Sequence, residues 1–333
     1  MNDIFRHTID VSNKRNEQSL SEIENYQNKH VVNKNVEFTK IGDDVSFSII
    51  FSTSKGVYIL DTKQNICKQI LAGKFYGITK YNDFTFFARL GTKGERSFPI
   101  NNRVSEICYS KICDYRIENL QIALYGIPSE LHQIEIINDN LVFPHTGYNQ
   151  ILSIPLEKIF QTNKPLKIDS CHSIELELNE YSHLNSIFYL NERFYIIAHN
   201  YTMKTNRLSD LIVFNTITNK QETIHLNAHS AHNIFIKNGD MIYCDSNNKI
   251  LMKNEKVLFT ANKLLRGLSV TEKNSFVGGS DICFDNYERY SSNPSIYVLN
   301  NHGKLQSEYI FEELGDIYEI RQLYDKELSV IQN

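Results

Sequence analysis

The residues best suited to chemistry in this 333-residue sequence lie in a short motif that occurs six times. Each copy has a polar or aromatic residue, then a small or polar residue, then Ile or Leu at the head of a strand-like run. The six copies are Tyr76-Gly77-Ile78, His132-Gln133-Ile134, Asn185-Ser186-Ile187, His232-Asn233-Ile234, Arg266-Gly267-Leu268 and Tyr318-Glu319-Ile320. The third position is always aliphatic and the first never is. We therefore expect the third side chain to be buried and the first to be accessible.

A second set of polar residues follows eleven or twelve positions after the aliphatic residue of five of these copies. Its members are Arg89, His145, His199, Asp245 and Ser280. In an antiparallel pair, the second strand returns to the edge where the first strand began. The two sets therefore predict one shared surface that is rich in imidazole, guanidinium, phenol and carboxylate groups.

Histidines that come from different strands suggest two kinds of chemistry at this surface. Several imidazoles could bind one divalent ion such as Zn²⁺, Mn²⁺ or Fe²⁺, or they could act as acid and base near neutral pH. The candidate metal ligands are His132, His145, His199, His232 and Asp245. A third alternative is that the histidines only fill polar gaps and hydrogen-bond to the backbone. The sequence leaves all three open.

The remaining polar residues are candidates for catalysis and substrate binding. The candidate catalytic residues are His132, His232, Tyr76, Tyr318 and Glu319. The candidate substrate-binding residues are Arg89, Arg266, Gln133, Asn233, Asn185 and His183. A guanidinium group matches an oxyanion in a bidentate way, although either arginine could instead pair with Glu319 or Asp245. The tyrosines would act as acids only if their pKa were lowered, and otherwise they pack with a satisfied hydroxyl.

The elements that must position these residues are predicted to be β-strands. The motif recurs every 34 to 56 residues, and each copy is followed by short alternating segments and turns, a pattern typical of a β-propeller. We expect a six-bladed all-β propeller over residues 35–333, with a polar arm or short helix at 1–34. The strands near residues 45–71 are expected to complete the last blade and close the ring. A seventh blade is the alternative, if Val36–Ile41 is a diverged copy of the motif.

Composition narrows the partners and the compartment. The net charge is −4 with both signs interspersed, which argues against nucleic acid and anionic membranes as partners. We predict a cytoplasmic protein because no signal peptide and no long apolar run is evident. The six scattered cysteines fit reduced thiols. No phosphate-binding loop, dinucleotide fingerprint or nucleophile elbow occurs, so neither a nucleotide cofactor nor ordinary serine hydrolysis is expected.

Four segments of the C-terminal half carry a family resemblance. They are Leu265-Arg266-Gly267-Leu268-Ser269-Val270, Phe276-Val277-Gly278-Gly279-Ser280, Ser295-Ile296-Tyr297-Val298-Leu299 and Gly315-Asp316-Ile317-Tyr318-Glu319-Ile320. Together they resemble a family of bacterial propellers that is distantly similar to arylsulfotransferase-type propellers, best over about 130–330. The resemblance implies a channel histidine that carries a transferred group, helped by other His and Arg side chains. His132, His232 and Arg266 match that arrangement by position.

These observations favour an enzyme that acts on a small polar or anionic metabolite at the mouth of a central channel. The site is predicted to be histidine-rich, with or without one bound metal ion, and the reaction would be an elimination, an isomerisation or a group transfer. The alternative is a propeller that binds a ligand or a protein without catalysis.

Overall fold

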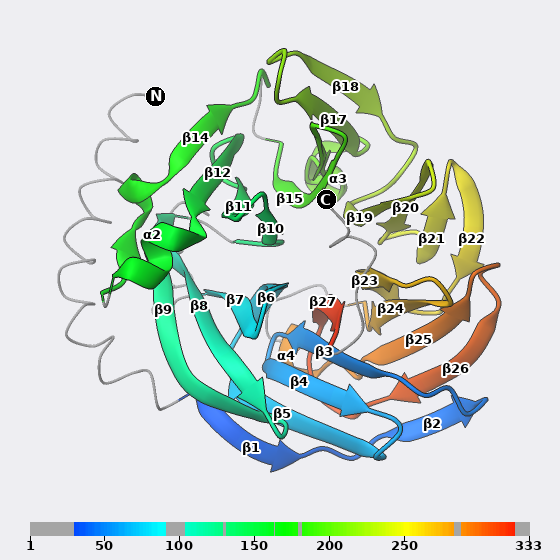
Figure 1. The fold of residues 1–333 in the computed structure, drawn as a ribbon. Coiled ribbons are helices and arrows are strands. Elements are labelled where there is room, and N and C mark those ends of the chain that lie inside the picture. Colours follow the sequence, from blue (N-terminus) through cyan, green and yellow to red (C-terminus); the bar gives the residue numbers. More distant parts are fainter. Residues whose placement is uncertain are drawn as a thin grey trace.

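Six β-sheets surround a central axis in the computed structural model of the chain (Figure 1). The structure describes residues 30–90, 104–128, 131–162, 164–178, 182–282 and 288–323. The fold is the expected six-bladed β-propeller. No helix within these ranges is long and apolar enough to cross a membrane.

Each of the six blades begins at the axis with a strand next to or containing one copy of the motif. From the axis outward, the first blade consists of β6 (Phe75–Tyr81), β7 (Phe84–Leu90), β8 (Val104–Cys113), β9 (Arg116–Pro128) and β13 (Leu166–Lys167). The second blade consists of β10 (Glu135–Ile137), β11 (Asn140–His145), β12 (Gln150–Pro155) and β14 (His172–Glu175). The third blade consists of β15 (Leu184–Leu190), β16 (Arg193–Ala198), β17 (Asp210–Asn215) and β18 (Gln221–His225). The fourth blade consists of β19 (Ala231–Lys237), β20 (Asp240–Asp245), β21 (Ile250–Lys253) and β22 (Lys256–Thr260). The fifth blade consists of β23 (Leu264–Val270), β24 (Asn274–Ser280), β25 (Ser295–Asn300), β26 (Leu305–Ile310) and β2 (Thr39–Gly42). The sixth blade consists of β27 (Ile317–Gln322), β3 (Ser48–Thr53), β4 (Gly56–Asp61), β5 (Ile66–Ala72) and β1 (Val31–Asn35).

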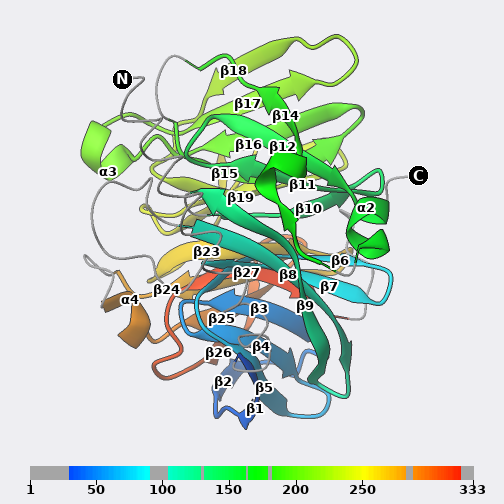
Figure 2. The same cartoon turned by 90° about the vertical axis from the view of Figure 1, so that its left-hand side faces the viewer.

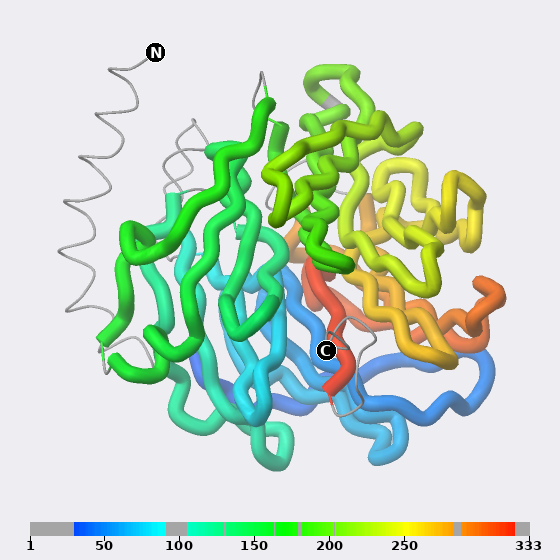
Figure 3. Tube along the Cα trace, turned by 45° about the horizontal axis from the view of Figure 1, so that its top comes forward, coloured from blue at the N-terminus to red at the C-terminus, as the bar shows by residue number. Residues whose placement is uncertain are grey.

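The two ends of the chain share the blade that closes the ring. The C-terminal strand β27 pairs with β3, and Figure 3 shows this red strand beside the blue N-terminal strands. The prediction that residues 45–71 complete the last blade is therefore confirmed. Closure of this kind protects the strand edges that an open sheet would expose.

The alternative of a seventh blade is wrong. Thr39–Gly42, at the end of the segment considered for it, forms β2, which pairs with β26 as the outermost strand of an existing blade. The predicted arm at 1–34 lies outside the described residues up to position 29. Strand β1 begins at Val31 and pairs with β5, so it spans the predicted boundary between arm and propeller.

The aliphatic residue of each motif copy is buried between the blades, as the pattern predicts. The six side chains are between 0% and 5% exposed: Ile78, Ile134, Ile187, Ile234, Leu268 and Ile320. Blade packing is therefore set by the third position of the motif. The expectation that the first position is accessible is wrong, because these side chains pack against one another in the channel: Tyr76, His132, Asn185, His232 and Tyr318 are between 1% and 8% exposed.

A β-bulge occurs at the first two positions of most motif copies. Five of the six innermost strands, β6, β15, β19, β23 and β27, have a register shift at the motif. A bulge places two residues opposite one residue of the partner strand and re-aims their side chains. Asn233 and Gly267 have positive φ angles, of 49° and 83°, at two of these shifts. The bulge thus directs consecutive polar side chains toward the axis.

The short helices mark the two faces of the ring. Figure 2 shows α3 (Thr202–Thr205) and α4 (Glu288–Ser291) on one face and α2 (Leu156–Gln161) toward the other. A 3-10 turn at Ile168–Ser170 follows β13. Both α3 and α4 follow the second strand of a blade, so their face is the one where the motif residues gather.

Candidate functional site

A small cavity lies on the axis at the end of the channel where the motif copies meet. Every residue that lines it among those described belongs to the first two positions of the motif: Tyr76, His132, Gln133, Asn185, Ser186, His232, Asn233, Arg266, Tyr318 and Glu319. Its volume of about 10 Å³ is room for roughly one water molecule. The structure therefore brings together nearly all of the first predicted set, and side chains fill most of the channel.

Four histidines form a cluster beside this cavity. The ring centroids are 4.9 Å apart for His132 and His183, 4.0 Å for His183 and His199, and 5.2 Å for His199 and His232. The rings of His132 and His232 are 6.5 Å apart, and all four side chains are buried. They come from four different strand ends in three neighbouring blades. This is the arrangement expected when equivalent positions of successive blades meet at one end of the channel.

Hydrogen bonds fix the tautomer of His132. The Arg266 guanidinium, which can only donate, lies 2.6 Å from Nδ1 of His132. Nδ1 is therefore the acceptor, and Nε2 carries the proton that His132 donates to Nε2 of His183 across 3.0 Å. Both ring nitrogens of His132 are committed within the protein.

His232 has the opposite tautomer. Its Nδ1 lies 2.8 Å from the carbonyl oxygen of Ser230 and 2.8 Å from Oγ of Ser246. Because a carbonyl only accepts, Nδ1 carries the proton and the lone pair is on Nε2. Among the described residues, no hydrogen bond is made to that Nε2.

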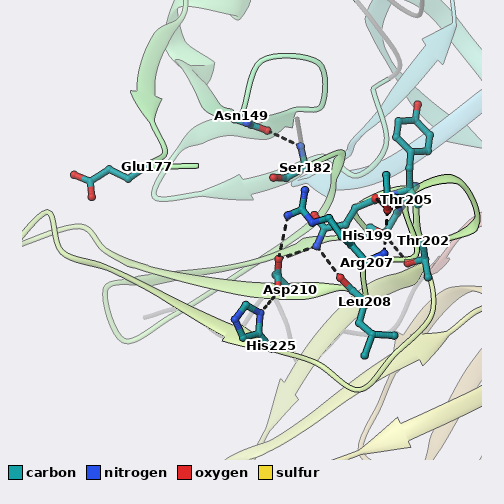
Figure 4. Close-up of polar contacts among 12 residues, drawn as sticks. Asn149, Glu177, Ser182, His199, Thr202, Thr205, Arg207, Leu208, Asp210 and His225 are labelled. Carbon is teal, nitrogen blue, oxygen red and sulfur yellow. Dashed lines mark hydrogen bonds and ion pairs between the residues drawn. The ribbon is translucent and has the colours of Figure 1, made fainter. Parts of the chain in front are cut away.

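His199 presents a proton where His232 presents a lone pair. The backbone N–H of Tyr201 donates to Nδ1 of His199 at 3.0 Å, which leaves the ring proton on Nε2. Side chains hold the loop that follows His199: Thr202 Oγ1 donates to the His199 carbonyl at 3.0 Å, and the Asn200 amide donates to Asp210 at 2.7 Å. Asp210 also accepts from His225 at 2.6 Å (Figure 4).

Burial keeps the four imidazoles neutral. It lowers the pKa of His132, His183 and His232 well below the usual 6.5, and the positive charge of Arg266 lowers it further. Burial also lowers the pKa of His199, to about 3. A neutral imidazole can accept a proton, attack an electrophile or bind a metal at neutral pH.

Cations and tyrosines surround the cluster on its other side. Arg266 lies 4.7 Å above the ring of Tyr318, and Lys74 lies 5.2 Å from the ring of Tyr76, which is 4.4 Å from Tyr318. Such cation–π contacts hold charged groups in place without neutralising them. Burial raises the pKa of Tyr318, so its phenol stays protonated at neutral pH.

A belt of hydrogen bonds around the cavity joins neighbouring blades. Gln133 accepts from the backbone of Ile187 at 3.2 Å, and Asn233 accepts from the backbone of Gly267 at 2.7 Å. Asn185 donates to the carbonyl of Ala231 at 2.8 Å. These amides were candidates for substrate binding, and in the structure they cross-link blades.

Glu319 belongs to a buried charge network at the same level. Its Oε1 lies 3.5 Å from Nε of Arg321, and Arg321 also pairs with Glu135. The nearest polar contact of Asn233 to Glu319 is 3.5 Å long. Among the described residues, the contacts of Glu319 thus indicate that its carboxylate balances the charge of Arg321. They give less support to the predicted catalytic role in proton transfer.

Most of the second predicted set lies outside the histidine cluster. Arg89 forms an ion pair, as one alternative from the sequence had it, but its partner is Glu106 and not Glu319 or Asp245. His145 bonds to the Pro128 carbonyl at 3.2 Å and to Gln150 at 3.1 Å. Asp245 accepts from the His229 backbone at 2.9 Å. Only His199 of this set reaches the cluster, because the other side chains find partners on their own or the adjacent blade.

The predicted metal site has no preformed counterpart in the described ranges. No group of three or more His, Cys, Asp or Glu side chains there is arranged to hold a metal ion. The Nε2 atoms of His132 and His183 share a proton, and a metal ligand needs its lone pair free. His132 could therefore ligate a metal through Nε2 only after its hydrogen bond to His183 is broken.

Several residues of the site were missed by sequence reasoning. Lys74, Tyr201 and Arg289 contact or electrostatically affect the cluster, and Asp316 pairs with Arg289 at 3.7 Å. Lys74 and Asp316 lie two residues before a first motif position, which is the signal that could have identified them. Tyr201 directly precedes α3 and Arg289 lies in the one-turn helix α4, and neither belongs to a repeating pattern.

Comparison with known proteins places the chain by fold. A chain in the crystal structure of a nidogen/laminin complex has a TM-score of 0.60 at 8% identity, covering 84% of this chain and 99% of that one. A protein of unknown function from Bacteroides caccae has a TM-score of 0.56 at 9% identity, covering 84% and 100%. No protein-family model and no curated protein matches the sequence. The class is therefore a six-bladed β-propeller, and likeness at this identity concerns fold alone.

Proposed function

We propose that the protein is an enzyme that acts on a small anionic metabolite at the channel mouth, with His232 as base or nucleophile. The observation that carries this proposal is the fixed tautomer of His232, whose Nδ1 is bound to the Ser230 carbonyl at 2.8 Å. This is the arrangement in which a second group orients an imidazole for chemistry at Nε2. Arg266 supplies positive charge beside it, and His199 supplies an N–H donor.

The reaction class follows from what a neutral imidazole does. Elimination and isomerisation begin with proton abstraction, and group transfer begins with nucleophilic attack. The resemblance to arylsulfotransferase-type propellers favours group transfer through a histidine. His232 is a better carrier than His132, because both ring nitrogens of His132 are engaged by Arg266 and His183.

A first test requires no knowledge of the substrate. Diethyl pyrocarbonate modifies unprotonated imidazole nitrogens, and free histidine is mostly protonated at about pH 5. We expect His232 to be modified at that pH and His145, whose two nitrogens are hydrogen-bonded, to resist. Peptide mass spectrometry locates the labelled residue. Equal labelling of the two histidines would contradict the proposed state of His232.

Turnover distinguishes the enzyme from a binding protein. Wild type and His232→Ala are compared on a panel of small phosphate, sulfate and carboxylate compounds, with the exposed His302→Ala as the control. The proposal predicts turnover in wild type and the control, and at least about a 100-fold loss in His232→Ala. A compound that binds wild type tightly but is never converted would favour the non-catalytic alternative.

A metal-dependent form of the same proposal uses His132, His199 and His232 as ligands to Zn²⁺, Mn²⁺ or Fe²⁺. Three imidazoles with an open position suit such an ion. Elemental analysis of untagged protein, beside a variant with His132→Ala and His232→Ala, tests it. About one equivalent of metal that the variant lacks would support this form. No metal in either protein would leave the metal-free reaction.

A further inference from the structure

His199 and His232 offer opposite hydrogen-bonding groups to an incoming ligand. Their rings lie 5.2 Å apart, centroid to centroid. The Tyr201 N–H occupies Nδ1 of His199, and the Ser230 carbonyl occupies Nδ1 of His232. One Nε2 is therefore a donor and its neighbour is an acceptor.

Both Nε2 atoms keep a little accessible surface. Neither has a hydrogen-bond partner among the described residues, and neither is among the fully buried polar atoms that lack one. Each atom can therefore meet a ligand that enters the site, although both side chains are only 8% exposed. His232 also lines the axial cavity, whose volume of about 10 Å³ admits one oxygen-sized group of a larger ligand.

The charged groups nearby favour a negative ligand. Lys74, Arg266 and Arg289 all lower the pKa of His132, while Asp316 is the carboxylate that pairs with Arg289. Glu319 also lines the cavity, so three of these five groups are positive and two are negative. A cleft with this balance concentrates anions.

We propose that the mouth binds a phosphate group that carries one proton, as hydrogen phosphate or the end of a phosphate monoester, in preference to sulfate. The proposal rests on the proposed function of the same site and specifies its ligand. The phosphate O–H donates to Nε2 of His232. The unprotonated oxygens accept from Nε2 of His199 and face the positive charge of Arg266.

Sulfate cannot make the contact with His232, because it has no proton to donate at neutral pH. An oxygen of sulfate at His232 would place one lone pair against another and leave a buried acceptor without a partner. Sites built to bond an O–H group reject analogues that lack it much more strongly than apolar sites reject a change in size. The preference for phosphate over sulfate therefore comes from Nε2 of His232, and the affinity for anions comes from Lys74, Arg266 and Arg289.

The experiment is calorimetric titration of the whole protein with inorganic phosphate and with inorganic sulfate, at equal ionic strength near neutral pH. We expect phosphate to bind at least about tenfold more tightly than sulfate. In His232→Gln the side-chain amide can turn to donate, so the ratio of the two affinities should fall to about one. The exposed His302→Gln is the matched control and should keep the wild-type ratio.

Three results would overturn the inference. They are equal affinity for the two anions in wild type, no binding of phosphate, and an unchanged ratio in His232→Gln. Circular dichroism and the melting temperature of each variant establish that it is folded. The proposed function is tested separately by turnover in His232→Ala, so an enzyme that takes sulfate or carboxylate compounds would survive failure of the phosphate inference.

Discussion

Single ring nitrogens decide what the histidine cluster can do. Repetition in the sequence placed His132 and His232 at equivalent positions, yet the structure gives them opposite tautomers through Arg266 on one side and Ser230 on the other. The motif places Arg266 at the same mouth as His132, although the two lie 134 residues apart, but it does not say which ring nitrogen the guanidinium contacts. Ser230 lies outside the motif altogether. Sequence reasoning finds which side chains meet, and only the contacts assign the protons.

The low pKa of His199 predicts how acid affects stability. Burial sets this pKa at about 3, with His183, His232 and Tyr201 packed around the ring and Arg266 and Arg289 acting on it. Above about pH 6.5 the residue is neutral in both states. As the pH falls further, the unfolded chain binds the proton first, so the free energy of unfolding decreases until the folded site protonates.

His199→Gln should therefore flatten the pH dependence of unfolding. Below about pH 6 the slope should be smaller than in wild type by up to about 1.4 kcal/mol per pH unit. Urea unfolding followed by circular dichroism at a series of pH values measures it. Parallel curves for the two proteins would mean that His199 protonates as easily when folded as when unfolded.

The innermost strand with its bulge is the element that the motif encodes. The alternation of polar and aliphatic residues was enough to predict six such strands and their buried third positions, because both follow from local pattern. The place of β2 was not predictable in this way. Its pairing with β26 joins Thr39 to Ile310, and a four-residue strand carries too little pattern to specify a partner so distant.

Two glycines test the bulge at the level of the element. Gly267 and Gly239 share a φ of +83°, but a Cβ on Gly267 would lie 3.0 Å from Ile317, whereas one on Gly239 meets nothing within 4 Å. Gly239→Ala should cost about 1–2 kcal/mol for the left-handed backbone alone. Gly267→Ala should cost about 1–3 kcal/mol more, because the packing between blades must shift. Urea denaturation gives both values, and equal costs would show that the bulge tolerates a side chain.

The whole ring depends on contacts across the channel as well as between neighbouring blades. Strand β27 brings Arg321 to Glu135, which comes from a blade two positions away around the ring. The resemblance between motif copies predicted a common mouth, but Glu135 and Arg321 each come directly after the aliphatic residue of a copy, outside the three motif positions, so neither was singled out. Their pairing depends on the ring being closed, which is a property of the complete fold.

Loss of Arg321 should weaken the complete propeller. Arg321 is 6% exposed, and Arg321→Met would leave Glu135 and Glu319 without their shared cation, at a cost of about 3–5 kcal/mol. Adding Glu135→Gln should recover part of that loss, because it removes one of the stranded charges. The exposed pair of Lys111 and Asp83 is the comparison, and Lys111→Met should cost less than about 1 kcal/mol. Equilibrium unfolding of the four proteins decides the matter: equal costs for Arg321→Met and Lys111→Met would mean that the ring is held by blade packing alone.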